Sequence, residues 1–507
     1  MAAVSTTASS ARADYDYSIP FVIGASSAGT VIEWYDFYLY ALLTPFLAPL
    51  FFPSDNPATS LISGFAVYGA GFAVRPLGAI VFGRIGDVIG RKYAFLLTVS
   101  IMGGATTIVG LLPVYSQIGI LAPIILVVLR MLQGLALGGE YGGAAIYVAE
   151  HAPDHKRGLY TSWIQTTATV GMFAALALIL ITRLAFGDAT YAAWGWRVPF
   201  LLSIVLIAAA LYIRLRLQET PLFQQLKTRG QTTRNTSSWA KDSFSGNKVG
   251  IILLVLIGMT AGQAVVWYQG QFQALFFLTT LLKVNFTQAY TILLVAIALA
   301  TPFFIVFGWL SDRVGRKLII LGGCAIAAIT YVPIYQAMVS AANVTYDGAG
   351  KISGANPNLV AETALVWIQI VYVTMVYGPI AAFLVEYFPA KIRYTSLSIP
   401  YHLGNGEFGG WLPFIQTGIV AATVAGAGYV PFLGLFDLRF LNPGGDPNGA
   451  IYSGLIYTIV VSVITAVVGF LFIPETKDRR IWEEVHATPE VAPSTAPAVS
   501  PGTAPAS

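Results

Sequence analysis

The sequence predicts an all-α polytopic membrane protein whose twelve transmembrane helices form two related halves of six helices each. Three observations point to this fold class. Hydrophobic residues make up 56% of the 507-residue chain and charged residues only 10%, whereas a soluble protein carries about 25% charged residues. Apolar runs of roughly 20 residues, each long enough to cross a bilayer as a helix, recur along the whole chain. Finally, one basic motif occurs twice.

The repeated motif reads Gly-Arg-Ile-Gly-Asp-Val-Ile-Gly-Arg-Lys at 83–92 and Gly-Trp-Leu-Ser-Asp-Arg-Val-Gly-Arg-Lys at 308–317. Two more pairs of similar sequence follow in the same order. They are Glu150, Pro153 and Arg157 against Glu386, Pro389 and Arg393, and then Glu219 against Glu475. Three sequence matches that occur in the same order in both halves indicate that the second half duplicates the first. The spacing between copies grows along the chain, so we expect insertions in the polar stretches 341–360 and 427–449.

The order of polar and apolar segments predicts the domain boundaries. A polar N-terminal segment, 1–19, precedes the first half at 20–214, and a polar linker, 215–248, leads to the second half at 249–473. The tail, 474–507, ends in a segment rich in Pro and Ala that we expect to be largely disordered. The first apolar run is too long for a signal peptide, so we expect it to be retained. The predicted spans are 20–49, 60–84, 93–112, 119–149, 158–182, 197–214, 249–279, 287–310, 318–339, 361–385, 395–425 and 450–473.

Lysine and arginine residues predict the orientation of the chain. If both termini are cytoplasmic, 21 of the 28 basic residues fall on the inner side and five on the outer side, while Arg75 and Arg130 lie inside spans. Cytoplasmic loops carry the excess of basic residues in membrane proteins. We therefore expect a multi-pass protein of the cell (inner or plasma) membrane with both termini in the cytoplasm.

With its twelve spans and its hairpin motif after spans two and eight, the chain resembles the major facilitator superfamily. The stretches Glu33-Trp-Tyr-Asp-Phe-Tyr, Arg130 to Ala144 and Leu217-Gln-Glu-Thr-Pro resemble a narrower group, the metabolite:proton symporter family. Members of that family carry α-ketoglutarate, citrate, shikimate, or proline and betaine. The resemblance implies the major facilitator fold and alternating access between two rocking halves. In the first motif copy, Val88 stands where the superfamily usually has Arg.

The two hairpins are predicted to form a cytoplasmic latch that holds the outward-open state. The candidate gate residues are Gly83, Asp87 and Arg91 in the first copy and Gly308, Asp312, Arg313 and Arg316 in the second. Each Asp sits where the N-terminus of a neighbouring helix could meet it, an arrangement that stabilises a carboxylate by about 0.3–1 kcal/mol. The alternative interpretation is a tight turn that serves as a topology signal.

Two acids in the first span are candidates for proton coupling. Glu33 and Asp36 lie three residues apart, on one face of a helix, and acids within a membrane span commonly mark an ion or substrate pathway. Two close carboxylates would not both ionise readily, so one would keep a proton. We prefer Asp36 for this role. The resemblance adds Arg130, which matches the arginine in helix 4 that the superfamily links to proton coupling. The alternative is a structural ion pair of an acid with Arg75 or Arg130.

Residues on several spans are candidates for substrate binding. Arg75 and Arg130 could bind a carboxylate through their guanidinium groups, and Gln263, Trp267 and Gln271 recur every four residues along one helix face. In the resembled fold, helices 1, 4, 7 and 10 line the cavity, which adds Gln369, Tyr372 and Tyr377. The alternative for this polar and aromatic stripe is buried contact between helices. The set favours a small carboxylate over a zwitterion such as proline or betaine.

Taken together, these features predict a secondary active transporter that couples uptake of a small organic acid to protons. A zwitterion symporter and an uncoupled uniporter remain the alternatives. The chain has only four histidines and no His-Glu-x-x-His pattern, which argues against an enzyme or a metal site. It also lacks a phosphate-binding loop, which argues against a primary pump. We expect no cofactor, with the proton gradient as the energy source. The expected partners are a small molecule, protons and the lipid bilayer, without nucleic acid, for a chain that acts as a monomer.

Overall fold

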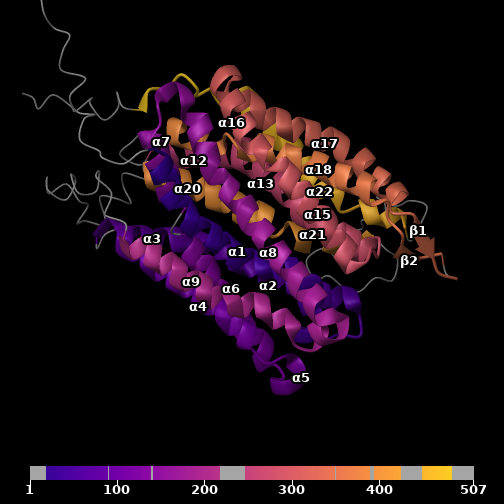
Figure 1. Ribbon diagram of the computed structural model, residues 1–507. Coiled ribbons are helices and arrows are strands. Elements are labelled where there is room, and N and C mark those ends of the chain that lie inside the picture. Colours follow the sequence, from indigo (N-terminus) through magenta and orange to yellow (C-terminus); the bar gives the residue numbers. More distant parts are fainter. Residues whose placement is uncertain are drawn as a thin grey trace, which may run out of the picture.

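Two bundles of long helices lie side by side along an interface that runs through the middle of the molecule (Figure 1). This computed structural model describes residues 19–88, 91–138, 141–216, 246–348, 350–388, 393–423 and 448–481. The predicted N-terminal segment, the linker 217–245, most of the tail and most of the stretch 427–449 lie outside the described residues. The all-α fold class is confirmed, and a helix or a run of helices occupies each of the twelve predicted spans.

The first half contains six spans, of which the second and the fourth are interrupted. Asn56 begins the second span as an N-cap, because its side chain accepts a hydrogen bond from the backbone N–H of Ala58 at 2.9 Å. The fifth span runs beyond the predicted 182 to Ala193, with a break at Gly187, whose φ is +74°. The elements are α1 Ile19–Phe51, α2 Pro57–Ala73, α3 Arg75–Val88, α4 Arg91–Leu111, α5 Tyr115–Ile118, α6 Leu121–Leu137, α7 Tyr141–His151, η2 Asp154–Lys156, α8 Arg157–Ala193, η3 Gly195–Arg197 and α9 Val198–Arg216.

The second half repeats this plan with more irregular helices. Its first span alternates between α-helix and π-helix: α12 Lys248–Val255, η4 Leu256–Thr260, α13 Ala261–Tyr268, η5 Gln269–Gln273, α14 Ala274–Phe276 and η6 Phe277–Leu281. The next elements are α15 Phe286–Ala300, α16 Pro302–Val314, α17 Arg316–Ala341, α18 Leu359–Tyr377 and α19 Ile380–Tyr387. The last are α20 Arg393–Leu403, the π-helix η7 Gly404–Gly410, α21 Leu412–Thr423, η9 Gly449–Tyr452 and α22 Leu455–Phe472.

A short β-hairpin occupies the polar stretch in which the sequence predicts only an insertion. Strands β1 (Val344–Tyr346) and β2 (Ile352–Ala355) pair antiparallel, with Val344 opposite Ala355. The sequence does not predict these strands because each is only three or four residues long. The hairpin follows α17 and precedes α18, outside the bundle (Figure 1).

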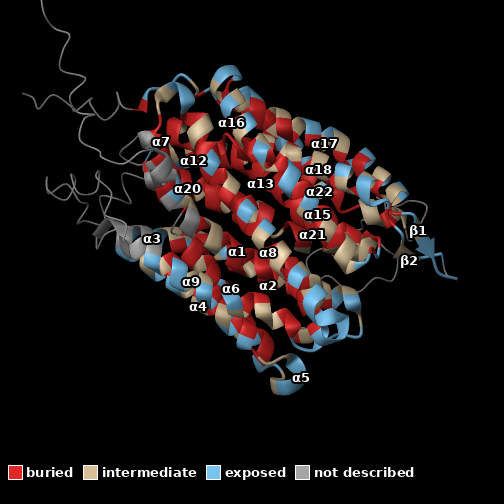
Figure 2. Cartoon of the chain, viewed as in Figure 1, coloured by how far each residue is buried: buried red, intermediate tan, exposed pale blue. Residues whose placement is uncertain are grey.

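The burial pattern is that of a bundle surrounded by lipid. Figure 2 shows buried residues inside both halves and along their contact, with exposed residues on the outer faces. Large apolar side chains are exposed on these outer faces, for example Leu184, Ile329 and Phe470. Within the described residues, nine helical segments are long and apolar enough to cross a membrane. The remaining three predicted spans correspond to α1, α4 and the α20–α21 segment.

Candidate functional site

Close contacts between glycines bring the two buried arginines of the first half together. A Cβ atom at Gly134 of α6 would lie 1.6 Å from the carbonyl oxygen of Gly71, and one at Gly138 would lie 2.1 Å from that of Arg75. Neither position tolerates a side chain, so α6 packs directly on the backbone of α2 and α3. Small residues permit such close approach between membrane helices. Arg130 on α6 and Arg75 at the start of α3 therefore lie in one buried region.

Arg130 is held on one side and free on the other. Its Nη1 donates to Oε1 of Gln133 at 2.7 Å and to the carbonyl oxygen of Phe37 at 3.5 Å, and Gln133 in turn donates to Thr106 at 2.7 Å. The Nε and Nη2 atoms of Arg130 are buried and have no hydrogen-bond partner among the described residues. Asp36 is not among the partners of Arg130, and the neutral Gln133 accepts one of its hydrogen bonds, while the side chain of Glu33 lies outside the described residues.

Arg75 lies against the same aromatic ring as Arg130. Its guanidinium carbon is 3.8 Å from the ring centre of Phe72 and 4.5 Å from that of Phe37, and the guanidinium carbon of Arg130 is also 4.5 Å from Phe37. The two guanidinium carbons are thus at most twice that distance apart. In Arg75, too, Nε and Nη2 lack a partner within the described part of the chain. Each arginine therefore presents its Nε–Nη2 edge, which matches the two oxygens of a carboxylate.

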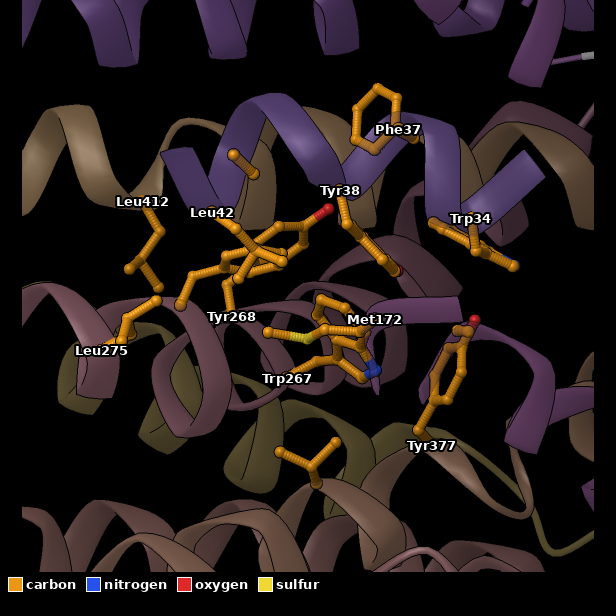
Figure 3. Packing of buried hydrophobic residues seen from close by; sticks show 14 of the residues in the cluster. Trp34, Phe37, Tyr38, Leu42, Met172, Trp267, Tyr268, Leu275, Tyr377 and Leu412 are labelled. Carbon is orange, nitrogen blue, oxygen red and sulfur yellow. The ribbon is translucent and has the colours of Figure 1, made fainter. Parts of the chain in front are cut away.

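The aromatic rings of both halves meet next to these arginines. Tyr38 stacks on Trp267 with ring centres 5.6 Å apart and lies 5.4 Å from Phe272, while Tyr68 faces Tyr268 at 6.4 Å. Figure 3 shows Tyr38 directed from α1 toward Trp267, with Phe37 on the opposite side of that helix. The structure thus places the predicted Trp267 at the contact between the halves, with its indole nitrogen unpartnered among the described residues.

Tyr377 joins the same interface through three residues that the sequence analysis does not single out as site residues. Its hydroxyl is 2.7 Å from that of Tyr401, whose ring stacks on Tyr141 at 3.6 Å. Gln165 of α8 donates both to the hydroxyl of Tyr141 and to the carbonyl oxygen of Tyr377, each at 3.0 Å. Gln165 is seven residues, or about two helical turns, from Gly158 on α8, so this group lies toward the hairpin end of the molecule, which we define by Asp312 and the start of α8.

Other predicted substrate residues turn toward neighbouring helices of their own half. The side chain of Gln369 donates to the sulfur of Met338 at 3.4 Å, and the Tyr372 hydroxyl accepts from Thr330 at 3.1 Å, both on α17. Tyr372 is five residues before Tyr377, which rotates it by about 140° around an α-helix. Gln369 and Tyr372 thus bond to α17 of their own half, whereas Tyr377 reaches the interface, and the role of Gln369 and Tyr372 in substrate binding stays a prediction.

The predicted stripe on the seventh span is also interrupted. Gln263 pairs with Asn405 at 3.3 Å inside the second half. Gln271 is buried in η5, and its amide atoms have no partner among the described residues. The backbone of a π-helix bonds residue i to i+5, so the spacing of four residues does not extend through η5. The neighbouring Gln269 instead donates to Tyr335 at 2.6 Å, on the far side of that span.

Asp36 bonds to α9, and among the described residues it pairs with neither arginine. One oxygen of its carboxylate accepts a hydrogen bond from Ser203 of α9 at 2.5 Å, and a Cβ atom at Gly103 of α4 would lie 3.2 Å from the other. Among the described residues, Asp36 forms no ion pair, so the predicted alternative of a pair with Arg75 or Arg130 is not observed for this acid. The side chain of Glu33 lies outside the described residues. Asp36 is thus buried where α1, α4 and α9 meet.

The second hairpin closes one end of the interface. The two carboxylate oxygens of Asp312 accept hydrogen bonds from the backbone N–H groups of Gly158 and Leu159, each at 2.8 Å, at the N-terminus of α8 in the other half. This is the predicted meeting of a motif carboxylate with a helix N-terminus. Gly308 permits the contact, because a Cβ atom there would lie 2.5 Å from the Cβ of Ser162. In the first copy, the side chains of Asp87 and Arg91 and the surroundings of Gly83 lie outside the described residues.

An ion-pair network supports this contact. Arg316 binds Asp312 at 2.6 Å and Glu386 at 3.1 Å, and Glu386 also binds Arg157 at 3.0 Å. Glu475 accepts from the backbone N–H of Arg316 at 2.9 Å and caps α17. The repeated sequence pairs of the two halves include Glu386, Arg157 and Glu475. The repetition alone does not identify the partners of these residues. The predicted gate residue Arg313 instead points outward, where it is exposed and lies 3.7 Å from the ring of Trp309.

Contacts between the halves close the opposite end as well. The hydroxyl of Tyr290 on α15 donates to the carbonyl oxygen of Leu42 on α1. Arg183 of α8 lies over the ring of Phe286 at 4.0 Å, and the rings of Tyr191 and Phe286 are 6.4 Å apart. Both ends of the interface are thus held shut around the buried arginines. The sequence predicts the latch at the hairpin end but not this second closure.

Residues 21–249 match the family described as "Sugar (and other) transporter". The shikimate transporter of Escherichia coli K12 is 33% identical over 78% of this chain and 86% of its own length, and the α-ketoglutarate permease of the same strain is 33% identical over 78% and 85%. The proline/betaine transporter of that strain is 31% identical over 75% and 74%.

Solved structures agree with the fold. The xylose transporter of Escherichia coli, in a partially occluded inward-open conformation, superposes with a TM-score of 0.63. The superposition covers 91% of this chain and 99% of that transporter, at 17% sequence identity. At this identity the likeness concerns the fold alone.

Proposed function

Because this chain belongs to the metabolite:proton symporter family of the major facilitator superfamily, we propose that it carries a small organic carboxylate into the cell together with protons. Its two halves would rock about the interface so that the buried site opens to one side of the membrane at a time. The proton gradient supplies the energy, and no cofactor takes part. The relatives named above are transporters, which is consistent with a chain that moves its substrate without altering it.

The single observation that supports a carboxylate substrate is that the Nε–Nη2 edges of Arg75 and Arg130 have no hydrogen-bond partner among the described residues. A buried guanidinium without an anion is costly, because its charge has left water without a compensating partner. The rings of Phe37 and Phe72 offset part of that cost, by about 0.5–2 kcal/mol for each good cation–π contact. A carboxylate on the Nε–Nη2 edge of Arg75 or Arg130 would offset more. Two such edges within reach of one ring favour an anion with two carboxylates, or with one carboxylate and a further polar group.

A zwitterion is the second candidate. The shared aromatic surface of Tyr38, Trp267 and Tyr268 could take a quaternary ammonium group through cation–π contacts, and a relative in the comparisons is named as a proline/betaine transporter. An arginine would then bind the single carboxylate. The presence of two arginines rather than one favours the organic acid.

We place the hairpin end on the cytoplasmic side, with both termini in the cytoplasm of a bacterial cell. The support is the excess of basic residues on that side, several of which form the network around Glu386. The closed hairpin end would then be the inner gate. The two halves in one chain supply both sides of the site, so a monomer is sufficient for transport.

Uptake by the purified chain in liposomes tests the function. With an inward proton gradient, α-ketoglutarate or shikimate should accumulate, and collapsing the gradient should abolish accumulation. Arg130→Gln should weaken binding of the carboxylate at least tenfold, since a charge-assisted hydrogen bond contributes about 1.5–3 kcal/mol. Arg313→Lys keeps the charge of an exposed arginine and serves as the matched control. Uptake of betaine with no competition by organic acids would favour the zwitterion instead.

A further inference from the structure

His402 is a buried ionisable residue that the proposed transport cycle has not yet used. It lies on α20, and only 1% of its surface is exposed. Neither ring nitrogen has a hydrogen-bond partner among the described residues. The imidazole packs against the ring of Tyr401, with ring centres 5.4 Å apart and planes at 78°. A buried histidine with a purely structural role normally bonds at least one ring nitrogen, and within the described part of the chain His402 bonds none.

The position of α20 brings this imidazole to the arginine site. Helix α20 belongs to the second half and packs on α3 and α7 of the first, and Arg75 begins α3. Tyr401, adjacent in the chain, reaches the same interface through Tyr377 and Tyr141. Among the described charged groups, the guanidinium of Arg75 is the one whose charge reaches His402.

Among the described residues of α20 and the elements around it, the other ionisable groups are neutral, engaged elsewhere or exposed, and Arg393 at the start of α20 donates to the carbonyl oxygen of Phe388. The side chains of Asp87, Glu150 and His151 lie outside the described residues. Glu386 is bound by two arginines, and Glu407 lies beside Trp411. Tyr141 and Tyr387 are neutral near pH 7. Arg84 is exposed on α3, and Lys248 lies at the start of α12. The charge state of His402 thus depends on whether the charge of Arg75 is balanced.

We infer that His402 is the proton acceptor that links proton binding to carboxylate binding, an inference that rests on the proposed function. In the empty site, burial away from water and the positive charge of Arg75 both oppose a second positive charge, so the imidazole stays neutral. A substrate carboxylate on the free edge of Arg75 cancels that charge and adds an acceptor nearby. The lone pair on a ring nitrogen then takes up a proton, which makes a third cation around the anion.

Coupling of this kind must be reciprocal. If the bound carboxylate favours a proton on His402, then the proton favours the carboxylate by the same factor. When the site opens to the cytoplasm and either one leaves, the other is released more readily, since protonated imidazole and Arg75 again repel each other. Substrate and proton therefore move in the same direction, as symport requires.

The test measures how substrate binding depends on pH in the purified full-length protein. The ligands are α-ketoglutarate and shikimate, whose carboxylates stay ionised between about pH 6 and 9. If one proton binds with the ligand, Kd rises tenfold per pH unit where the empty site is unprotonated. Calorimetry in two buffers of different ionisation enthalpy counts the same proton directly. In His402→Gln, we expect the slope of log Kd against pH to fall by one and the counted proton to disappear.

The controls separate the possible outcomes. His155→Gln makes the same change at an exposed histidine in η2 and should keep the wild-type slope. His402→Asn is a second variant in case the first is unstable, and thermal unfolding checks the folding of both. A wild-type slope in either folded His402 variant would overturn the role of His402 while leaving carboxylate transport intact. If neither ligand binds the wild type at any pH, both this inference and the proposed function fail.

Discussion

Asp36 and His402 are two buried groups that could carry a proton, and they occupy different places. His402 lies on α20, which packs on the helix that Arg75 begins, whereas Asp36 accepts from Ser203 between α1, α4 and α9, inside the first half. Because Asp36 pairs with neither arginine among the described residues, we do not expect it to bind the substrate directly. It could respond instead to movement of α1 against α9, because that packing sets the hydrogen bond from Ser203.

This difference gives a prediction for Asp36→Asn. If Asp36 binds and releases a proton as the protein changes conformation, the variant should lose accumulation driven by a pH gradient but retain counterflow exchange. Its Kd should keep the wild-type dependence on pH, because the substrate-linked proton sits elsewhere. Flux measurements in liposomes check the predicted loss of accumulation, and binding in detergent checks the predicted pH dependence of Kd. Asp55→Asn, at an exposed loop residue, is the control. Accumulation at the wild-type level in Asp36→Asn would exclude Asp36 as a coupling acid.

At the scale of single elements, the contact of Asp312 with the start of α8 is the best-defined part of the latch. Asp312→Asn replaces one acceptor oxygen with a donor that faces a backbone N–H, and it removes the charge that Arg316 binds. Losing charge-assisted bonds of about 1.5–3 kcal/mol should shift the balance between the two gates by roughly 10- to 100-fold. We expect slower transport with normal insertion, measured as initial uptake per inserted protein.

Asp347→Asn provides the matched control for this latch variant, since Asp347 is exposed on the β-hairpin. Arg316→Gln should resemble Asp312→Asn, because it breaks the same network from the other partner. Wild-type uptake rates in both Asp312→Asn and Arg316→Gln would show that the latch does not control the cycle.

The same elements show what can be predicted from sequence. Hydropathy predicts the spans because lipid requires about 20 apolar residues per helix, and repetition identifies Asp312 because both copies preserve its surroundings. The partner of Asp36 depends on how α1 packs on α9, which no local pattern encodes. Likewise, Tyr401 and His402 contribute to the interface because α20 crosses α3, and the π-helical segments alter which glutamines face inward. The arginines are predicted correctly as buried, but their aromatic surroundings require the structure.

At the scale of the whole molecule, contacts hold both ends of the interface shut, so transport requires one end to open at a time. The hairpin end closes by direct backbone contact: a Cβ atom at Gly158 would lie 2.5 Å from the carbonyl oxygen of Gly308, and one at Gly308 would lie 2.5 Å from Ser162. A large side chain at either glycine is incompatible with this closed arrangement. It is compatible with a molecule whose halves have separated at that end.

Gly308→Trp should therefore hold the hairpin end open. The arginine site is built from α3 and α6, away from this contact, so we expect the variant to bind its carboxylate within about threefold of the wild-type affinity. Accumulation and counterflow should both be lost, because the site can no longer close to the cytoplasm and face outward. This differs from Asp36→Asn, for which counterflow persists. Gly322→Trp on α17, where an added Cβ meets open space, should transport normally. Normal counterflow in Gly308→Trp would mean that transport proceeds without closure at Gly308, contrary to alternating access through this gate.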